Sequence, residues 1–138
     1  MAKPTKKMIS ETMKQMDLCM MTTYGAHGWL VSRPMSNNAQ VDYDGDSYFF
    51  TRPDTRKLRD IARDDRVALD FQGGGVWLTI RGKASVHDDP ELMRKHWTQD
   101  IEKWFGHGPE ERGGVRLIRV TAHEAELYGQ DEGVVDMT

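Results

Sequence analysis

Short apolar segments with period-two alternation, separated by glycine- and proline-containing turns, fill most of this chain and constrain its fold more than any other feature. They predict strands over residues 18–24, 29–40, 47–51, 66–72, 76–87, 115–121 and 125–128. Asp44 with Gly45, and the glycine triplet at 73–75, are typical of hairpin connections between such strands. Because closing a sheet on itself removes the edges that would otherwise pair with other chains, six or seven antiparallel strands of this length favour a small β-barrel.

Helical spacing appears in three places around these strands. Ile9, Met13 and Met16 recur at i, i+4 and i+7 and predict an amphipathic first helix over about residues 4–17. A short second helix is predicted inside a basic segment described below. A third helix is predicted over residues 90–105, where large apolar side chains gather on roughly one side.

Length and charge limit the classes of protein that remain. At 138 residues the chain fits one domain, with the barrel over about residues 18–128 and a short tail at 129–138. It carries 19 basic and 22 acidic side chains, for a net charge of −3. This balance argues against nucleic acid or an anionic membrane as a partner, so any anion site must be local.

The apolar segments, the cysteine and the histidines indicate the cellular compartment and whether a metal site is expected. No apolar run reaches the roughly 20 residues that cross a bilayer, and the N-terminus lacks an apolar signal core, so a cytoplasmic protein is the default expectation. Cys19, the only cysteine, is predicted to be a buried strand residue. The five histidines are scattered without ligand-like spacing, and we predict no metal site.

The segment 51–63, TRPDTRKLRDIAR, places two cations where a helix does not favour them. If Thr55 caps a helix, Arg56 and Lys57 fall in its first turn, close to the unpaired N–H groups and the positive end of the helix dipole. A phosphate would resolve this conflict, and the hydroxyls of Thr51 and Thr55 could complete its binding site. The alternative, that both cations point into water without a function, stays open at this point.

The strand predicted over residues 29–40 carries a second polar cluster. Alternation places Arg33 and Met35 on one face of it, and Pro34 marks an edge or a bulge because proline cannot donate to a ladder. If this strand lies near Thr51, Arg33 could reach the same anion. An arginine inside a barrel is costly without a counter-charge, so we expect Arg33 either to face solvent or to have a partner.

The segments SRPM, YFFT, RKLRDI, RVALDF and GKASV, in this order and spacing, carry a resemblance to a known family. Together they closely resemble the pyridoxamine 5′-phosphate oxidase-like FMN-binding split-barrel superfamily, most of all its general stress protein 26 branch. The resemblance runs from about Met16 to Tyr128. It implies a six-stranded antiparallel split β-barrel of Greek-key type with flanking helices, a homodimer, and two FMN sites at the dimer interface.

The resemblance also assigns residues to the cofactor. Arg33 matches the arginine that opens the flavin-contacting strand of the family. Met35 and Ser36 match neighbours whose backbone lines the isoalloxazine ring.

Further assignments lie in the basic segment. Phe50 and Thr51 match the family's aromatic–threonine pair, and Arg56 and Lys57 match its phosphate-binding pair. The phosphate site implied by the resemblance is thus the one that the helix dipole argument gives, with Thr55 at its edge.

Two departures from the oxidase itself limit what the resemblance implies. Trp77 stands where the oxidase has a glutamine that contacts flavin, and an indole can pack on the ring but cannot supply the amide's acceptor. The chain ends in AHEAELYGQDEGVVDMT, without the arginines with which the oxidase holds its substrate. This difference argues against oxidation of pyridoxamine phosphate itself.

The function expected from the sequence is therefore that of an FMN-binding protein acting as a flavin-dependent oxidoreductase of unknown substrate. Trp104 is the aromatic residue that we expect to cap the flavin ring. FAD, which presents a phosphate at the same point, is the less favoured cofactor. A flavin-binding stress module without turnover is the leading alternative, and a barrel that binds haem or no cofactor is a third.

Overall fold

The computed structural model describes residues 3–36, 43–96 and 115–138 of the chain. Three helices lie within these ranges: α1 Lys6–Lys14, α2 Arg56–Arg63 and α3 Pro90–His96. The strands are β1 Leu18–Tyr24, β2 Leu30–Ser36, β3 Asp46–Thr51, β4 Arg66–Gly73, β5 Val76–His87, β6 Arg116–Tyr128 and β7 Gly133–Asp136. No helix in the described ranges is long and apolar enough to cross a membrane.

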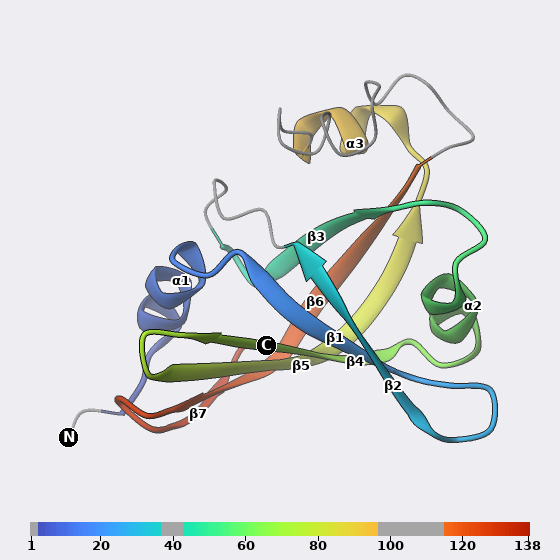
Figure 1. Ribbon diagram of the computed structural model, residues 1–138. Coiled ribbons are helices and arrows are strands. Elements are labelled where there is room, and N and C mark those ends of the chain that lie inside the picture. The colour runs from blue at the N-terminus through green and yellow to red at the C-terminus, as the bar shows by residue number, and fades with distance from the viewer. Residues whose placement is uncertain (1–2, 37–42, 97–114) are drawn as a thin grey trace.

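The strands form one antiparallel sheet that curls into an open barrel (Figure 1). Its order is β2-β1-β4-β5-β6-β3, and β7 pairs with β6 beside this path. Within the described residues β2 and β3 do not pair with each other, so the sheet stays open there, as expected of a split barrel. Pro34 lies in β2, which is an edge strand of the described sheet, so its missing N–H disrupts no ladder on the open side.

The structure differs from the sequence prediction in the C-terminal strands. Residues 115–121 and 125–128 were predicted as two strands, but one continuous strand, β6, runs through both. The polar interval between them is a β-bulge, because β5 advances from Arg81 to Gly82 while its partner on β6 moves from Glu124 to Ala122 and passes over His123. A Cβ atom on Gly82 would collide with the carbonyl oxygen of Thr121, so this crossing requires glycine.

The predicted tail at 129–138 also contains structure, since β7 within it pairs with the second half of β6. The predicted third helix is present from Pro90 to His96, and the rest of its range, to residue 105, lies outside the described residues. Ile9 and Met13 are buried on α1, as their spacing predicted, and Cys19 is buried on β1.

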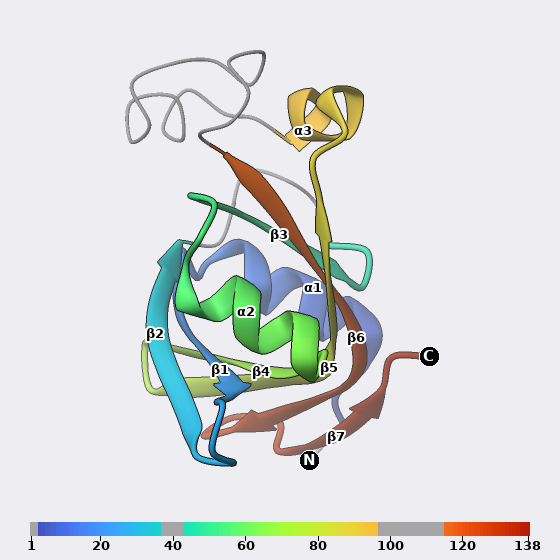
Figure 2. The same cartoon turned by 90° about the vertical axis from the view of Figure 1, so that its right-hand side faces the viewer.

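The inward face of the barrel is filled by aliphatic, methionine and phenylalanine side chains from all the main strands. Phe49, Phe71, Met21 and Leu69 are among the largest that are fully buried. Helix α2 contacts β1 and β5, and Figure 2 shows it in front of the barrel, on the side away from α1. This position brings the first turn of α2 close to the ends of β1 and β3, where the candidate site lies.

Candidate functional site

The entry into α2 is an unusual piece of backbone. Asp54 adopts φ 60°, a left-handed conformation that aspartate tolerates better than most residues. Arg59 holds this turn from within the helix, because its Nη1 donates to the carbonyl oxygen of Asp54 at 2.9 Å. Thr55 follows as the N-cap with an extended backbone, but its side chain makes no capping hydrogen bond. Its Oγ1 is buried and has no hydrogen-bond partner among the described residues.

Lys57 turns back from the first turn of α2 towards the end of β3. Its Nζ donates to Oγ1 of Thr51 at 2.9 Å. Burial lowers the pKa of Lys57, and the nearby charge of Arg33 lowers it further. Within the described ranges no carboxylate forms an ion pair with Lys57. The site therefore holds a partly buried ammonium group next to another cation, which is an arrangement that an anion would stabilise.

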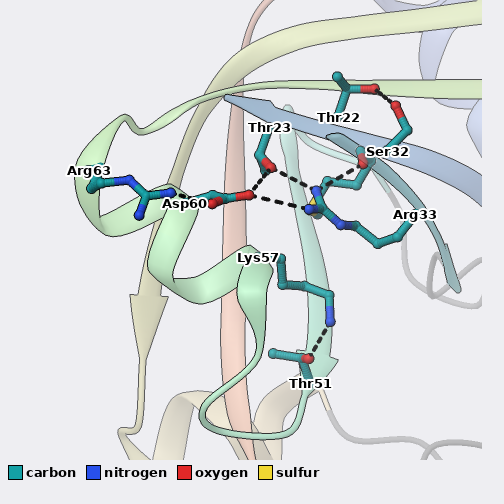
Figure 3. A network of polar contacts seen from close by, with 9 residues as sticks. Thr22, Thr23, Ser32, Arg33, Thr51, Lys57, Asp60 and Arg63 are labelled. Atoms are coloured by element: carbon teal, nitrogen blue, oxygen red, sulfur yellow. Dashed lines mark hydrogen bonds and ion pairs between the residues drawn. The ribbon is translucent and has the colours of Figure 1, made fainter. Parts of the chain in front are cut away.

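Arg33 reaches the same region from β2. Its Nη1 donates to the carbonyl oxygen of Met21 at 3.2 Å and to Oγ1 of Thr23 at 2.8 Å. Its Nη2 lies 3.5 Å from Oδ2 of Asp60. Burial lowers the pKa of Arg33 although Asp60 opposes this effect. Figure 3 shows Lys57 between Arg33 and Thr51, so the two cations that the sequence placed on separate elements do lie together.

Arg56 contributes the third cation. Its Nη2 lies 3.5 Å from the point where a Cβ atom on Gly25 would stand, so its guanidinium group reaches the turn between β1 and β2. Its charge is close enough to lower the pKa of Arg33. The set that the structure brings together, here called the cationic cradle, is Arg33, Thr51, Thr55, Arg56 and Lys57.

Asp60 is a residue of this region that the sequence analysis missed. Its side chain is 1% exposed, and its carboxylate accepts hydrogen bonds from Thr23, at 2.9 Å, and from Arg63, at 2.5 Å. It is also the partner that Arg33 was expected to need. The sequence did hold one indication of this role. Asp60 stands next to Ile61, on the apolar side of α2, where a buried carboxylate needs a partner.

Other predicted site residues do not join the cradle through their side chains. Phe50 alternates with Thr51 and packs near Met93 instead. Met35 belongs to the barrel core, and Ser36 is exposed, where it donates to Oδ1 of Asp17 at 3.2 Å.

Trp77 and Trp104 were the two tryptophans predicted to contact the flavin. Trp77 is on β5, paired with Gln72 at the far end of the β4–β5 hairpin from α2, and its side chain is 44% exposed. Trp104 lies outside the described residues.

An open antiparallel barrel with a group of cations and hydroxyls at the N-terminus of one helix defines the class of this protein. Residues 4–137 match the family model described as pyridoxamine 5′-phosphate oxidase like, and the chain belongs to this family. This result confirms the family that the sequence segments resembled.

Individual relatives agree with that assignment. Protein bli-3 of Neurospora crassa is 32% identical over 130 residues, covering 85% of this chain and 62% of that protein. The chain thus spans about three-fifths of the length of this curated relative.

Solved structures extend the likeness to the fold. A protein related to general stress protein 26 from Clostridium acetobutylicum matches with a TM-score of 0.79 at 17% identity, covering 91% of this chain and 89% of that chain. The General Stress Protein 26 of Bacillus anthracis matches with a TM-score of 0.75 at 20% identity, covering 92% and 95%. At these identities the likeness establishes the fold, which is the predicted split barrel.

Proposed function

We propose that this protein binds FMN, with the phosphate of the cofactor in the cationic cradle, and acts as a flavin-dependent oxidoreductase. The family is one whose members commonly bind flavin, and its fold is of a flavin-binding type. The observation that carries the proposal is the buried, unpartnered Oγ1 of Thr55 at the N-terminus of α2. A buried hydroxyl without a partner costs about 1–3 kcal/mol, which a phosphate oxygen accepting its hydrogen bond would recover.

The charges of the cradle fit a phosphate monoester. Arg56 and Lys57 are the first two residues of α2, where the free N–H groups and the helix dipole already favour an anion. Lys57 and Arg33 repel one another in the protein as it stands, and a dianion between them would reverse this repulsion into two attractions. Helix α1 also begins with two cations, Lys6 and Lys7, but its N-cap hydroxyl, on Thr5, accepts a hydrogen bond from the N–H of Met8. The hydroxyl of Thr55 at the start of α2 has no such partner among the described residues.

The proposed assembly is a homodimer with the flavin between subunits. Trp77 lies six residues along the β4–β5 ladder from the end near α2, which corresponds to about 20 Å at the usual rise per residue. Figure 1 shows the tip of this hairpin and α2 on opposite sides of the barrel. If Trp77 contacts the flavin, as the family resemblance implies, this separation favours a Trp77 from a second chain beside a flavin held by Lys57. In that arrangement the site proposed for FMN is complete only in the dimer.

In the proposed complex the protein positions the flavin, and the flavin carries out the redox chemistry. Flavin supplies the hydride or electron chemistry when it is bound. The residues of the cradle fix the phosphate end and thereby set where the ring projects. The buried α2 face and the barrel core beneath it keep that anchor rigid.

The visible absorption spectrum of the purified protein, together with the mass of the cofactor released on denaturation, tests the proposal. We expect a flavin band and the mass of FMN, either as purified or after incubation with FMN and removal of the excess. Absence of a flavin band after this incubation would reject flavin binding. Release of FAD, or a haem spectrum, would reject FMN as the cofactor.

A second measurement separates an enzyme from a flavin-binding stress module without turnover. Rapid bleaching of the bound flavin by a reduced nicotinamide, followed by reoxidation with an acceptor, supports the oxidoreductase. A bound flavin that stays oxidised with every donor offered supports the module.

Alkaline pH is expected to weaken FMN binding and to leave riboflavin binding unchanged. The pKa of Lys57 is lowered from 10.5 by burial and by Arg33, and only its protonated form attracts phosphate. Bound phosphate favours that protonated form, so the association constant starts to fall at the lowered pKa, below pH 10.5, and keeps falling up to the higher pKa of the complex. Quenching of flavin fluorescence, titrated from neutral pH upward, measures both ligands.

Lys57→Arg is the matched control for this titration, because arginine keeps its proton throughout the range. The alkaline loss should disappear in this variant. An equal loss for FMN and riboflavin in the unaltered protein would contradict the assignment to Lys57.

A further inference from the structure

A buried pair of polar side chains lies behind the cationic cradle and is not part of it. Thr23, on β1, and Asp60, on α2, are each 1% exposed and are joined by a hydrogen bond of 2.9 Å from Oγ1 to Oδ2. We propose that Thr23 and Asp60 are positioning residues, which hold the guanidinium group of Arg33 so that its remaining N–H groups meet the phosphate. The inference rests on the function proposed above.

The hydrogen bonds of Arg33 show how the holding works. Its Nη1 is committed to the carbonyl oxygen of Met21 and to Thr23, and its Nη2 faces Asp60 on the same end of the group. The Nε–H, and the Nη2 hydrogen beside it, have no partner in the described part of the chain. These two donors form the parallel fork that binds two oxygens of a phosphate at once. One end of the guanidinium group is thus anchored, and the other is available to a ligand.

The pair also links α2 to β1, the strand that pairs with the one carrying Arg33. Asp60 lies three residues after Lys57 on α2, so it shares the rigid helix that carries the phosphate-binding first turn. Thr23 is on β1, which pairs with β2 so that Met21 stands opposite Arg33. The bridge between Thr23 and Asp60 therefore fixes β1 relative to the helix that carries Lys57, and the pairing of β1 with β2 extends this to the strand of Arg33.

Charge alone does not explain the arrangement. A carboxylate near a phosphate site opposes anion binding through space, so Asp60 would be unfavourable if it acted only by its charge. Arg63 contacts the other carboxylate oxygen, Oδ1, and Figure 3 shows it on the side of Asp60 away from Arg33. This external cation offsets the charge of Asp60 and leaves its directional contacts with Thr23 and Arg33.

Thr23→Val is the sharpest test, because it removes the hydroxyl while keeping the shape and the net charge of the site. We expect FMN affinity to fall by about three- to tenfold and riboflavin affinity to stay unchanged, since one anchoring hydrogen bond of Arg33 is lost. Thr22→Val is the matched control. Thr22 is the neighbouring residue of the same strand, and its hydroxyl contacts Ser32 at 2.7 Å instead of the network behind the cradle. It should leave both affinities unchanged.

The route through Arg33 has its own test. In an Arg33→Met background, Thr23→Val should no longer change the ratio of FMN to riboflavin affinity, because the anchored group is absent. Equal losses of FMN and riboflavin in Thr23→Val, or the same change of the ratio in both backgrounds, would overturn the proposal. Thr23→Ala removes the same hydroxyl without adding a methyl group, and it is measured in the same way if the valine variant is too unstable.

Failure of this inference is distinguishable from failure of the proposed function. If the unaltered protein binds FMN no better than riboflavin, the phosphate site itself is wrong. If it prefers FMN and Thr23→Val keeps that preference in full, only the positioning role is wrong.

Discussion

Replacing Lys57 or Arg56 with alanine is expected to weaken FMN binding about tenfold or more in each case and to leave riboflavin binding nearly unchanged. Hydrogen bonds to charged groups contribute about 1.5–3 kcal/mol, and each 1.4 kcal/mol is roughly a tenfold change in affinity. Both side chains lie at the first turn of α2, where they touch the phosphate in the proposed complex and not the ring. Titration of each variant with both ligands gives the four affinities required.

Lys7→Ala is the charge-matched control for these variants. Lys7 is exposed on α1, on the other side of the barrel, and its loss changes the net charge by the same amount. Its removal should alter neither affinity. If FMN and riboflavin lose affinity equally in Lys57→Ala, the phosphate does not lie in the cradle.

FMN is also expected to shift the protein from monomer to dimer and to raise its melting temperature. The outer face of the sheet exposes large apolar side chains, and Trp77 lies beside Tyr128 there in the pairing of β5 with β6. Such a patch is typical of a surface that a symmetric partner covers. If the flavin contacts both chains, it must bind the dimer more tightly than the monomer, and linkage then requires FMN to favour association.

Sedimentation at several protein concentrations, with and without FMN, measures this coupling. A monomer that binds one FMN per chain at low concentration would contradict an interfacial site, even if the alanine variants behave as expected. Riboflavin should promote the dimer as well, because the ring makes the contact with the second chain.

Most of the barrel could be predicted from the sequence because each strand buries one face. Period-two alternation then marks the strands, and the turns between them carry glycine. The prediction failed at β6, where His123 interrupts the alternation. A β-bulge and a turn between two separate strands interrupt the alternation of apolar and polar residues in the same way. Only the pairing of β6 with β5 at Gly82 shows that the interruption is a bulge.

The sequence predicted the part of the candidate site that lies within one helix better than the contacts between residues on different elements. The conflict between the helix dipole and Lys57 can be read from consecutive residues, and it led to the cradle. The partner of Arg33 could not be found in this way, because Asp60 meets it only through the packing of α2 on β1. Alternation in β3 does explain why Phe50 points away from Thr51.

The pairing of β3 with β6 sets the order in which the site can be assembled during synthesis. Thr51 lies opposite Arg116, and β6 is the strand on which β3 is built. All five residues of the cradle leave the ribosome before β6 does, yet among the described strands β3 pairs only with that late strand. From the synthesis of Lys57 until that of Arg116, a growing chain therefore carries the cradle residues without the strand that fixes β3. In the proposed complex, binding of FMN then follows completion of the barrel.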